Sequence, residues 1–291
     1  MRNAERGTGN GGSARLLPST LRSPLRAFTS PLGSAMDVRL LGTRQTVILA
    51  AGNGSRLSAQ RGELPKPLVR VAGRALIDHA LEQAAAAGVE EAIIVTGKAA
   101  DQMRAHLATV ETPVKLTLVH NERYHDPNGV SLLCAEQFVT GPFYLQMADH
   151  VFAHPVLRQL DRVDGVAPEA LRLMVDFHPV NLDEADATKV RVADGRITSI
   201  GKDIYPYDAV DTGCFRLDPR VFGALRHVAR AEPPSVTLGM RHLLAQGLLA
   251  AVPLVGVRWT DVDTPEDYAK AEMLLSAQLR RRASVGVTAA A

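Results

Sequence analysis

The chain has 291 residues, of which 46% are hydrophobic and 22% charged, so it suits one large α/β domain or two small ones with a substantial core. Its net charge is +2, but residues 1–35 carry five arginines and one glutamate, which leaves the remainder with a net charge of −2. That distribution excludes an obvious nucleic-acid-binding surface. No apolar run approaches the ~18 residues of a membrane-spanning helix, so we expect no membrane insertion. Cys134 and Cys214 match no metal or redox spacing, which is typical of a reduced cytoplasmic protein.

Residues 1–40 are predicted to lie outside the folded domain. The first 35 residues are rich in Arg, Ser, Gly and Pro and lack the apolar core of a secretory signal. A disordered arm, a transit-like leader and upstream sequence translated from a mis-chosen start are the alternatives. We favour a disordered or artefactual extension, because Met36 lies just before the first clear strand. The folded domain is then expected at 41–282, followed by a frayed Ala-rich tail at 283–291.

From residue 46 the pattern alternates between strands and helices. We expect strands at 46–51, 91–97, 114–121 and 143–148, and helices at 76–87, 101–110 and 131–139. Continuous apolar runs are typical of strands that are covered on both faces. Gly88 is the usual left-handed terminator of the helix before it. This alternation predicts an α/β fold with a doubly wound, mostly parallel, Rossmann-like sheet.

The second half has a different pattern. A strand is expected at 171–177, and alternating segments at 188–192 and 196–200 flank an Asp-Gly turn, which indicates an antiparallel hairpin. Such a hairpin, inserted in a parallel sheet, suggests a lobe that covers a substrate. A buried strand interrupted by Pro253 follows at 248–257. The last helix is expected at 265–282, with Thr264 as its N-cap.

The first strand runs into a glycine loop at 49–57, and a lysine between two prolines follows at Lys66. Glycines let the backbone approach a ligand and present its N–H groups to anionic oxygens. A P-loop would require a Gly-Lys-Ser/Thr ending, which is absent, and Leu57 holds the position of the third glycine of a dinucleotide-binding loop. The remaining pattern is the signature of nucleotidyltransferases. The predicted nucleotide contacts in this region are Leu49, Ala50, Ala51, Gly52, Gly54, Ser55, Arg56 and Lys66.

Three aspartates are candidate metal ligands. Asp149 follows strand 143–148, at the sheet edge where open α/β sheets bind ligands. Asp261 and Asp263 are two residues apart, so an extended backbone places both on one side. Mg²⁺ prefers hard oxygen ligands and keeps coordination positions for phosphate. We therefore expect Mg²⁺ between Asp149 and one of this pair, with Asp261 as first choice and the other aspartate capping the final helix. The alternative for Asp149 is a cap on the next helix.

Two further features have a functional and a structural interpretation. Asn128-Gly129-Val130-Ser131 opens a helix whose N-terminus can accept an anion or a base edge, and we include Asn128, Gly129 and Ser131 among the nucleotide-binding candidates. The alternative is a plain Asn-Gly turn with a serine cap. Lys202 follows the hairpin and can reach the covered cleft, although a lone lysine is more often solvated. His150 is expected to orient or support its neighbours.

The blocks together resemble the inositol-1-phosphate cytidylyltransferase family, within the wider sugar-phosphate nucleotidyltransferases of GT-A-like fold. They run in family order from about residue 46 to 274: L-A-A-G-N-G-S-R-L, P-K-P-L-V-R-V-A-G, N-G-V-S-L-L, A-D-H-V, A-T-K-V-R-V-A-D-G-R-I-T-S-I-G-K, D-T-G-C-F and W-T-D-V-D-T-P-E-D. The first two are generic to nucleotidyltransferases, and the later ones are more selective. Ala148 and Pro127 depart from the family, which usually has glycine at both positions.

The resemblance implies CTP as donor, Mg²⁺ as cofactor, and CDP-inositol and pyrophosphate as products. It places Arg56 and Lys66 on the triphosphate and Lys202 at the reacting phosphates, which makes these three the catalytic candidates. Many members of that family are fused to a membrane domain that uses the CDP-alcohol, and we expect none here because the chain ends after its last helix. A homodimer is compatible with the sequence.

Several alternatives stay open at this point. The acceptor is inositol 1-phosphate, phosphocholine, a phosphonate, a sugar phosphate or another cyclitol phosphate. A glycosyltransferase of similar topology would place Asp-x-Asp at the central strand, where residues 147–149 read Met-Ala-Asp. A non-catalytic nucleotide sensor would tolerate the loss of the metal-binding carboxylates.

Overall fold

Strand β1 (Gln45–Ala50) is buried along its whole length. Val47 and Leu49 pack into one hydrophobic cluster, while Ile48 and Ala50 pack into another on the opposite face. Because successive side chains of a strand point to opposite faces, this double burial requires helices on both sides of the sheet. The computed structural model describes residues 43–52, 55–57, 64–162, 167, 170–180 and 183–288.

Nine strands form the main sheet in the order β5-β4-β1-β6-β11-β8-β12-β10-β9. Strands β5, β4, β1 and β6 are mutually parallel, as is the pair β8 and β12, whereas β11 runs antiparallel to both β6 and β8. The bounds beyond β1 are β4 (Glu91–Thr96), β5 (Lys115–His120), β6 (Phe143–Met147), β8 (Leu171–Asp176), β9 (Lys189–Ala193), β10 (Arg196–Gly201), β11 (Ala209–Leu217) and β12 (Leu249–Pro253).

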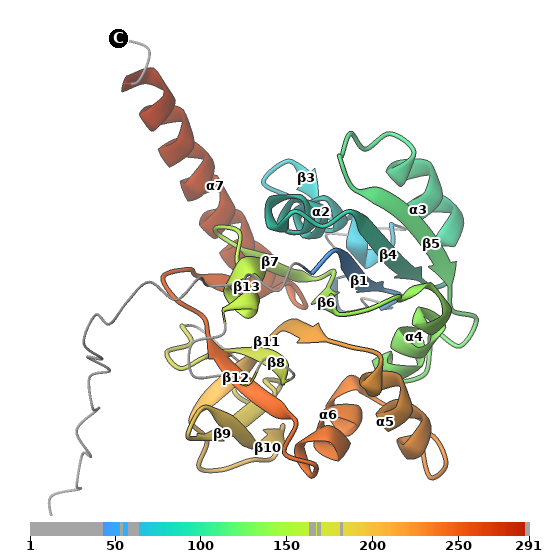
Figure 1. Ribbon diagram of the computed structural model, residues 1–291. Coiled ribbons are helices and arrows are strands. Elements are labelled where there is room, and N and C mark those ends of the chain that lie inside the picture. The colour runs from blue at the N-terminus through green and yellow to red at the C-terminus, as the bar shows by residue number, and fades with distance from the viewer. Residues whose placement is uncertain are drawn as a thin grey trace, which may run out of the picture. The chain divides into compact units, whose positions relative to one another are not determined.

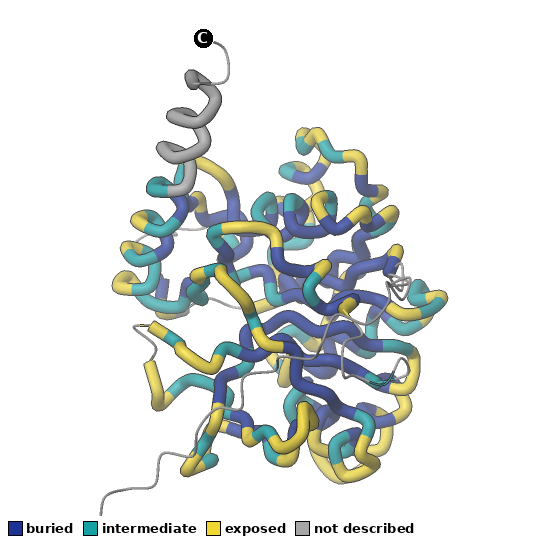
Figure 2. Tube along the Cα trace, turned by 60° about the vertical axis from the view of Figure 1, so that its left-hand side comes forward, coloured by how far each residue is buried: buried dark blue, intermediate teal, exposed yellow. Residues whose placement is uncertain are grey.

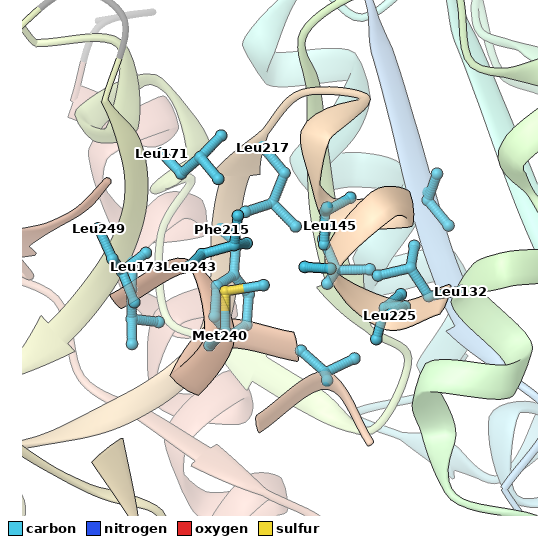
Figure 3. Close-up of a cluster of buried hydrophobic side chains, with 14 of the residues drawn as sticks. Leu132, Leu145, Leu171, Leu173, Phe215, Leu217, Leu225, Met240, Leu243 and Leu249 are labelled. Carbon is cyan, nitrogen blue, oxygen red and sulfur yellow. The ribbon is translucent and has the colours of Figure 1, made fainter. Parts of the chain in front are cut away.

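Helices cover both faces of this sheet (Figure 1). One face is covered by α2 (Leu76–Ala87) and α3 (Ala100–Leu107), and the other by α4 (Asn128–Cys134), α5 (Arg220–Val228) and α6 (Val236–Leu244). The central strands are buried, whereas the edge strands β5 and β9 and many connecting turns are partly or fully exposed (Figure 2). Figure 3 shows the second of these faces, where side chains of β6, β8, β11 and β12 pack against those of α4, α5 and α6. The doubly wound α/β prediction is therefore confirmed.

Two short pairings lie outside the main sheet, and the first of them carries His150 and Asp261. Strand β7 (His150–Phe152) pairs antiparallel with β13 (Trp259–Asp261), and β2 (Arg70–Val71) pairs with β3 (Arg74–Ala75). Four 3-10 turns complete the described elements: η1 (Ser55–Leu57), η2 (Lys66–Leu68), η3 (Glu136–Phe138) and η4 (Leu157–Asp161).

The predicted elements of the first half form with small shifts in their ends. Helix α2 has the predicted bounds, and Gly88 closes it with a left-handed φ of 76°. Helix α3 ends at Leu107 rather than 110. Helix α4 begins at Asn128 and ends at Cys134, with the 3-10 turn η3 in place of its expected last turn.

The predicted hairpin forms as β9 and β10, but it extends the main sheet instead of standing apart as a lobe. Strand β9 pairs with both β10 and β11, and β10 pairs with β12. Strand β11 and helices α5 and α6 were not predicted. Both cysteines are free, as expected.

The last helix, α7 (Pro265–Thr288), begins where the sequence predicted but continues past the expected end at 282, so the prediction of a frayed tail from 283 was wrong up to 288. Thr264 Oγ1 accepts a hydrogen bond from Asp267 N at 3.2 Å, and the Asp267 carboxylate accepts from Thr264 N at 3.1 Å. This reciprocal arrangement is a capping box, so Thr264 is the N-cap, as predicted. No helix within the described residues is long and apolar enough to cross a membrane.

Candidate active site

A cleft lies at the carboxyl ends of β1 and β6, the edge where open α/β sheets bind ligands. It brings together segments that are far apart in the chain: the end of β1, the η2 turn, the start of α4 and the turn after β6. Many predicted nucleotide contacts are among its lining residues, which are Leu49, Ala50, Ala51, Gly52, Lys66, Pro67, Tyr124, Asp126, Asn128, Ser131, Met147, Ala148 and Asp149. Gly54 lies outside the described residues.

Lys66 is held in a rigid turn. It opens η2 between two prolines, and Pro65 has the φ of −63° that proline imposes. Leu68 N donates to Pro65 O at 2.9 Å, and Val69 N donates to Lys66 O at 3.0 Å, which closes the turn. The residue is only 5% exposed, although it is a lysine. A buried ammonium requires partners, and these define the centre of the site.

The partners of Lys66 are two carboxylates from distant parts of the chain. Its Nζ donates to Asp149 Oδ2 at 2.5 Å and also to Asp263 Oδ1. Desolvation lowers the pKa of Lys66, but the two carboxylates outweigh this and raise it, so the ammonium stays charged. Desolvation would raise the pKa of Asp149, yet Lys66 and a hydrogen bond from His150 bring it well below its usual range. Asp149 is therefore an anion at neutral pH.

Arg56 adds a second positive charge. Its neighbour Leu57 is fully buried in a cluster with Val262, which anchors η1 beside the segment that carries Asp263. Arg56 Nη2 consequently donates to Asp263 Oδ2 at 3.0 Å. Leu57, which holds the third-glycine position, thus fixes Arg56 by hydrophobic packing. Asp263 binds both predicted triphosphate-contacting cations.

Arg56 and Lys202 meet at one carboxylate. Arg56 Nη1 donates to Asp186 Oδ2 at 3.0 Å, and Lys202 Nζ donates to Asp186 Oδ1. Asp186 lies in the loop before β9, and Lys202 follows the end of β10. The hairpin therefore brings Lys202 to the carboxylate that also binds Arg56, an aspartate that the sequence analysis did not select, whereas the expected reach of Lys202 into the cleft stays a prediction.

The carboxylate that converges with Asp149 is Asp263, not the first choice, Asp261. Strand β13 ends at Asp261, so the two-residue alternation does not continue to Asp263. Asp261 lies beside His150, and burial raises its pKa, an effect that His150 offsets only in part. Neither aspartate caps α7, since Thr264 and Asp267 form that cap. The expected helix-capping role was wrong for this reason.

These residues fit a divalent-metal site of the kind completed by substrate. Within the described part of the chain, no three acidic, histidine or cysteine side chains gather as a metal site. Asp149 and Asp263 nevertheless converge on one positive charge, the Lys66 ammonium. Mg²⁺ in phosphate-transfer sites is bound by one or two carboxylates, with phosphates and water completing its coordination. Two converging carboxylates match that donor set.

His150 contacts the carboxylate of Asp149 and is itself held by packing. Its Nδ1 lies 2.9 Å from Asp149 Oδ1, and its ring stacks on Trp259 with centroids 5.6 Å apart. Trp259 Nε1 donates to Asp176 Oδ2 at 2.9 Å. Gly213 has a φ of +73°, and a Cβ there would lie 2.8 Å from the His150 ring, so glycine is required for this packing. This matches the expected supporting role of His150.

The start of α4 is used by a tertiary contact as well as by the cleft. Asn128 Oδ1 accepts from Val236 N at 2.9 Å, at the start of α6. A Cβ on Gly129 would lie 2.5 Å from Pro234 O, so only glycine allows this approach. Ser131 Oγ accepts from Asn121 Nδ2 at 2.9 Å. All three predicted residues thus have structural partners, while Asn128 and Ser131 also line the cleft.

Some residues at this edge were missed by the sequence analysis. Beside the cleft, a second hollow of about 340 Å³ is lined by Ala51, Gly52, Lys98, Asp101 and other residues around them. Gly97 lies there because a Cβ would meet Ala51 O at 2.9 Å and Tyr124 Cβ at 2.8 Å. A glycine at the carboxyl end of a predicted parallel strand is the signal that would have found it. Asp186 carries no comparable local signal.

Comparison with known proteins places the chain among nucleotide-transferring proteins by similarity. The model of the MobA-like NTP transferase domain matches residues 46–166. A bifunctional IPC transferase and DIPP synthase of Rubrobacter xylanophilus is 35% identical over 230 residues, 78% of this chain and 51% of the relative. Its counterpart in Archaeoglobus fulgidus is 36% identical over 79% of this chain and 44% of the relative. The chain therefore spans about half the length of these curated relatives.

Solved structures give the same result for the fold. The inositol-1-phosphate CTP transferase from T. maritima superimposes with a TM-score of 0.73 and 26% identity, covering 81% of this chain and 96% of its own. A UDP-glucose pyrophosphorylase complexed with UDP-glucose, at 19% identity, has a TM-score of 0.69, which supports the fold alone. The glycine loop and the proline-flanked Lys66 both lie within residues 46–166, the part of the chain that matches the NTP transferase domain model.

Proposed function

We propose that this protein is a Mg²⁺-dependent cytidylyltransferase that transfers CMP from CTP to inositol 1-phosphate or a closely related phosphorylated alcohol, releasing pyrophosphate. The observation that carries the proposal is the convergence of Lys66, Arg56, Asp149 and Asp263 at the carboxyl edge of the sheet. The choice of CTP and inositol phosphate rests on the T. maritima inositol-1-phosphate CTP transferase, whose fold this chain shares over 81% of its length.

In this proposal, the glycine loop and the two cations bind the triphosphate. An oxygen of the acceptor's phosphate attacks the α-phosphorus, a new P–O bond forms, and the bond to the β-phosphate breaks as pyrophosphate leaves. Lys66 and Arg56 neutralise the charge of the departing phosphates, and Lys202 meets the reacting phosphates from the hairpin. Bound through Asp149 and Asp263, Mg²⁺ would supply additional neutralisation of phosphate charge.

This reaction requires no general base. A phosphate monoester has a second pKa near ~6, so the attacking oxygen is already ionised at neutral pH. The side chains therefore need to align two anions and to neutralise their charge. The cluster described above, in which three cations alternate with three carboxylates, suits that task.

The test is pyrophosphate release with the four common nucleoside triphosphates against inositol 1-phosphate, phosphocholine, a phosphonate and a sugar 1-phosphate. We expect release with CTP, Mg²⁺ and inositol 1-phosphate. Asp149→Asn should lower kcat by at least ~10³-fold with an unchanged circular dichroism spectrum, because it removes a charged ligand from the reacting centre. Release with another pair would reassign the substrates, and no release with any pair would favour a nucleotide sensor.

Asp194→Asn is the matched control. Asp194 lies in the exposed β9–β10 turn with a φ of 50°, a conformation that asparagine also tolerates. It should keep the activity of the unmodified protein. Near-normal turnover by Asp149→Asn would show that the metal site is wrongly assigned.

A further inference from the structure

The charged side chains of the site form one continuous chain of alternating sign. From the hairpin to the central sheet the order is Lys202, Asp186, Arg56, Asp263, Lys66, Asp149 and His150. Each neighbour in this chain is within hydrogen-bonding distance of the next. Six of its members already have a binding or supporting role in the proposed reaction. Asp186 is the exception.

Asp186 occupies a decisive position in that chain. It is the member that joins the hairpin side, represented by Lys202, to the glycine-loop side, represented by Arg56. Both cations are about half exposed, with side-chain exposures of 55% and 54%, so both are long, mobile side chains unless something fixes them. Asp186 itself is less exposed, at 32%.

The backbone holds Asp186 in place. Its N–H donates to Asp183 O at 3.2 Å, and the next residue's N–H donates to the same oxygen at 3.0 Å. The Asp183 side chain closes the turn by accepting from Ala185 N at 3.0 Å. After the turn, Thr188 O accepts from Asp211 N at 2.9 Å, which ties the loop to β11. The Asp186 carboxylate therefore extends from a turn that backbone hydrogen bonds hold in shape.

We propose that Asp186 is a positioning residue for the nucleotidyl transfer, holding Arg56 and Lys202 at the place where the triphosphate and the acceptor phosphate meet. It acts through the two cations and need not touch either substrate. Arg56 has five N–H donors and Lys202 three, so each keeps donors for phosphate while it is bound to Asp186. The inference rests on the proposed function.

Because Asp186 is negatively charged, its substitution separates a positioning role from a direct role in binding phosphate. Removing a carboxylate cannot weaken the electrostatic attraction for a triphosphate, since it removes a negative charge near it. Misplacing the two cations does, however, cost alignment in the transition state. We expect Asp186→Asn to lower kcat by ~10- to 100-fold while leaving KM for CTP unchanged or lower. A merely structural role would lower the melting temperature and raise KM.

The coupling to Lys202 gives a second readout. If Asp186 acts through Lys202 and Arg56, then Asp186→Asn should cost little in a protein that already carries Lys202→Ala and Arg56→Ala. Independent effects would multiply instead. Glu184→Gln is the matched control, because Glu184 lies in the same loop and its Oε1 accepts from Tyr207 Oη at 3.1 Å, outside the charged chain. It should retain normal kcat.

The contact can also be tested without any turnover. Acylation of Lys202 by an amine-reactive reagent, followed by mass spectrometry with Lys98 as internal reference, should be several-fold faster in Asp186→Asn than in the unmodified protein or Glu184→Gln. Equal labelling rates together with a normal kcat in Asp186→Asn would overturn the inference. If the unmodified protein releases no pyrophosphate, the proposed function fails, whereas faster labelling would still establish the Asp186–Lys202 contact.

Discussion

Individual carboxylates at this sheet edge differ in charge state because their surroundings differ. Asp149 has the Lys66 ammonium at 2.5 Å and stays ionised. Asp211 accepts one hydrogen bond, from Gly213 N at 2.7 Å, and burial raises its pKa to about 6. Buried carboxyls without a close cation hold their proton to higher pH. Asp149 follows β6 and Asp211 lies in the neighbouring strand β11, yet only the first suits a permanently charged role.

The raised pKa of Asp211 predicts a pH-dependent cost to stability. The folded protein binds this proton up to about pH 6, whereas the unfolded chain releases it near the ordinary value of 3.8, so stability falls as pH rises between these values. Asp211→Asn removes the cost and keeps an oxygen for Gly213 N. It should stabilise the protein by about 1–3 kcal/mol at pH 7.5 and by much less at pH 4.5.

Thermal unfolding at the two pH values would check this prediction. Asp183→Asn is the control, because Asp183 makes the same kind of bond to a backbone N–H two residues on but is exposed. It should change stability little at either pH. A destabilised Asp211→Asn protein at pH 7.5 would show that the ionised carboxylate has a stabilising partner.

At the scale of elements, the sheet edge depends on the close approach of backbone segments. Helix α4 begins against the segment that precedes α6, and Asn128 Oδ1 binds the first N–H of α6. The approach is possible because Gly129 has no side chain. The start of α4 also lines the cleft, so this packing sets where Asn128 and Ser131 stand relative to Lys66.

Adding one methyl group to that contact should be costly. Gly129→Ala would place Cβ 2.5 Å from Pro234 O, and the rigid backbone must shift, at a cost of about 1–3 kcal/mol. Gly223→Ala is the contrasting variant: in α5 the new Cβ meets nothing within 4 Å, and alanine favours helix by about 0.5–1 kcal/mol. Differential scanning calorimetry should show a lower melting temperature for the first and a slightly higher one for the second. A stable Gly129→Ala protein would mean that α4 and α6 can separate easily.

An element can be predicted from the sequence when neighbouring residues determine it, and it is missed when long-range pairing does. Helix α2 was predicted to the residue because a left-handed Gly88 ends it, and β1 was predicted to within one residue at each end because its apolar run is continuous. Strand β11 was missed since it pairs with β6, β8 and β9, and none of these contacts is visible locally. The hairpin was identified, but its place in the sheet depends on the same long-range pairing.

At the scale of the whole molecule, residues from four distant parts of the chain hold one another through charge. Asp149 follows β6, Asp263 precedes α7, Asp186 precedes β9, and the two cations Arg56 and Lys66 come from the segments after β1. Because like charges are kept apart and opposite charges are in contact, the arrangement is favourable before any ligand binds. A bound triphosphate and metal would substitute for some of these contacts.

Ligand binding should therefore stabilise the fold. At 100 times its dissociation constant, CTP with Mg²⁺ should contribute about 2.7 kcal/mol, which for a domain of this size raises the melting temperature by roughly 5–10 °C. Differential scanning fluorimetry with each nucleoside triphosphate would measure the effect, and CTP should give the largest shift. Omission of Mg²⁺, or Asp149→Asn, should reduce it. Equal shifts for all four nucleotides would argue against selection of cytosine.

The sequence by itself determined the class of fold and the resemblance to nucleotidyltransferases, because both depend on local patterns: apolar runs between helices, a glycine loop and a lysine between prolines. It also identified Arg56, Lys66 and Asp149 as a group. Only the tertiary structure decided that Asp263 rather than Asp261 faces Asp149, and that Asp186 joins Arg56 to Lys202. The physical reason is that a strand's alternation ends where the strand ends, and ion pairs between distant segments leave no periodic trace in the chain.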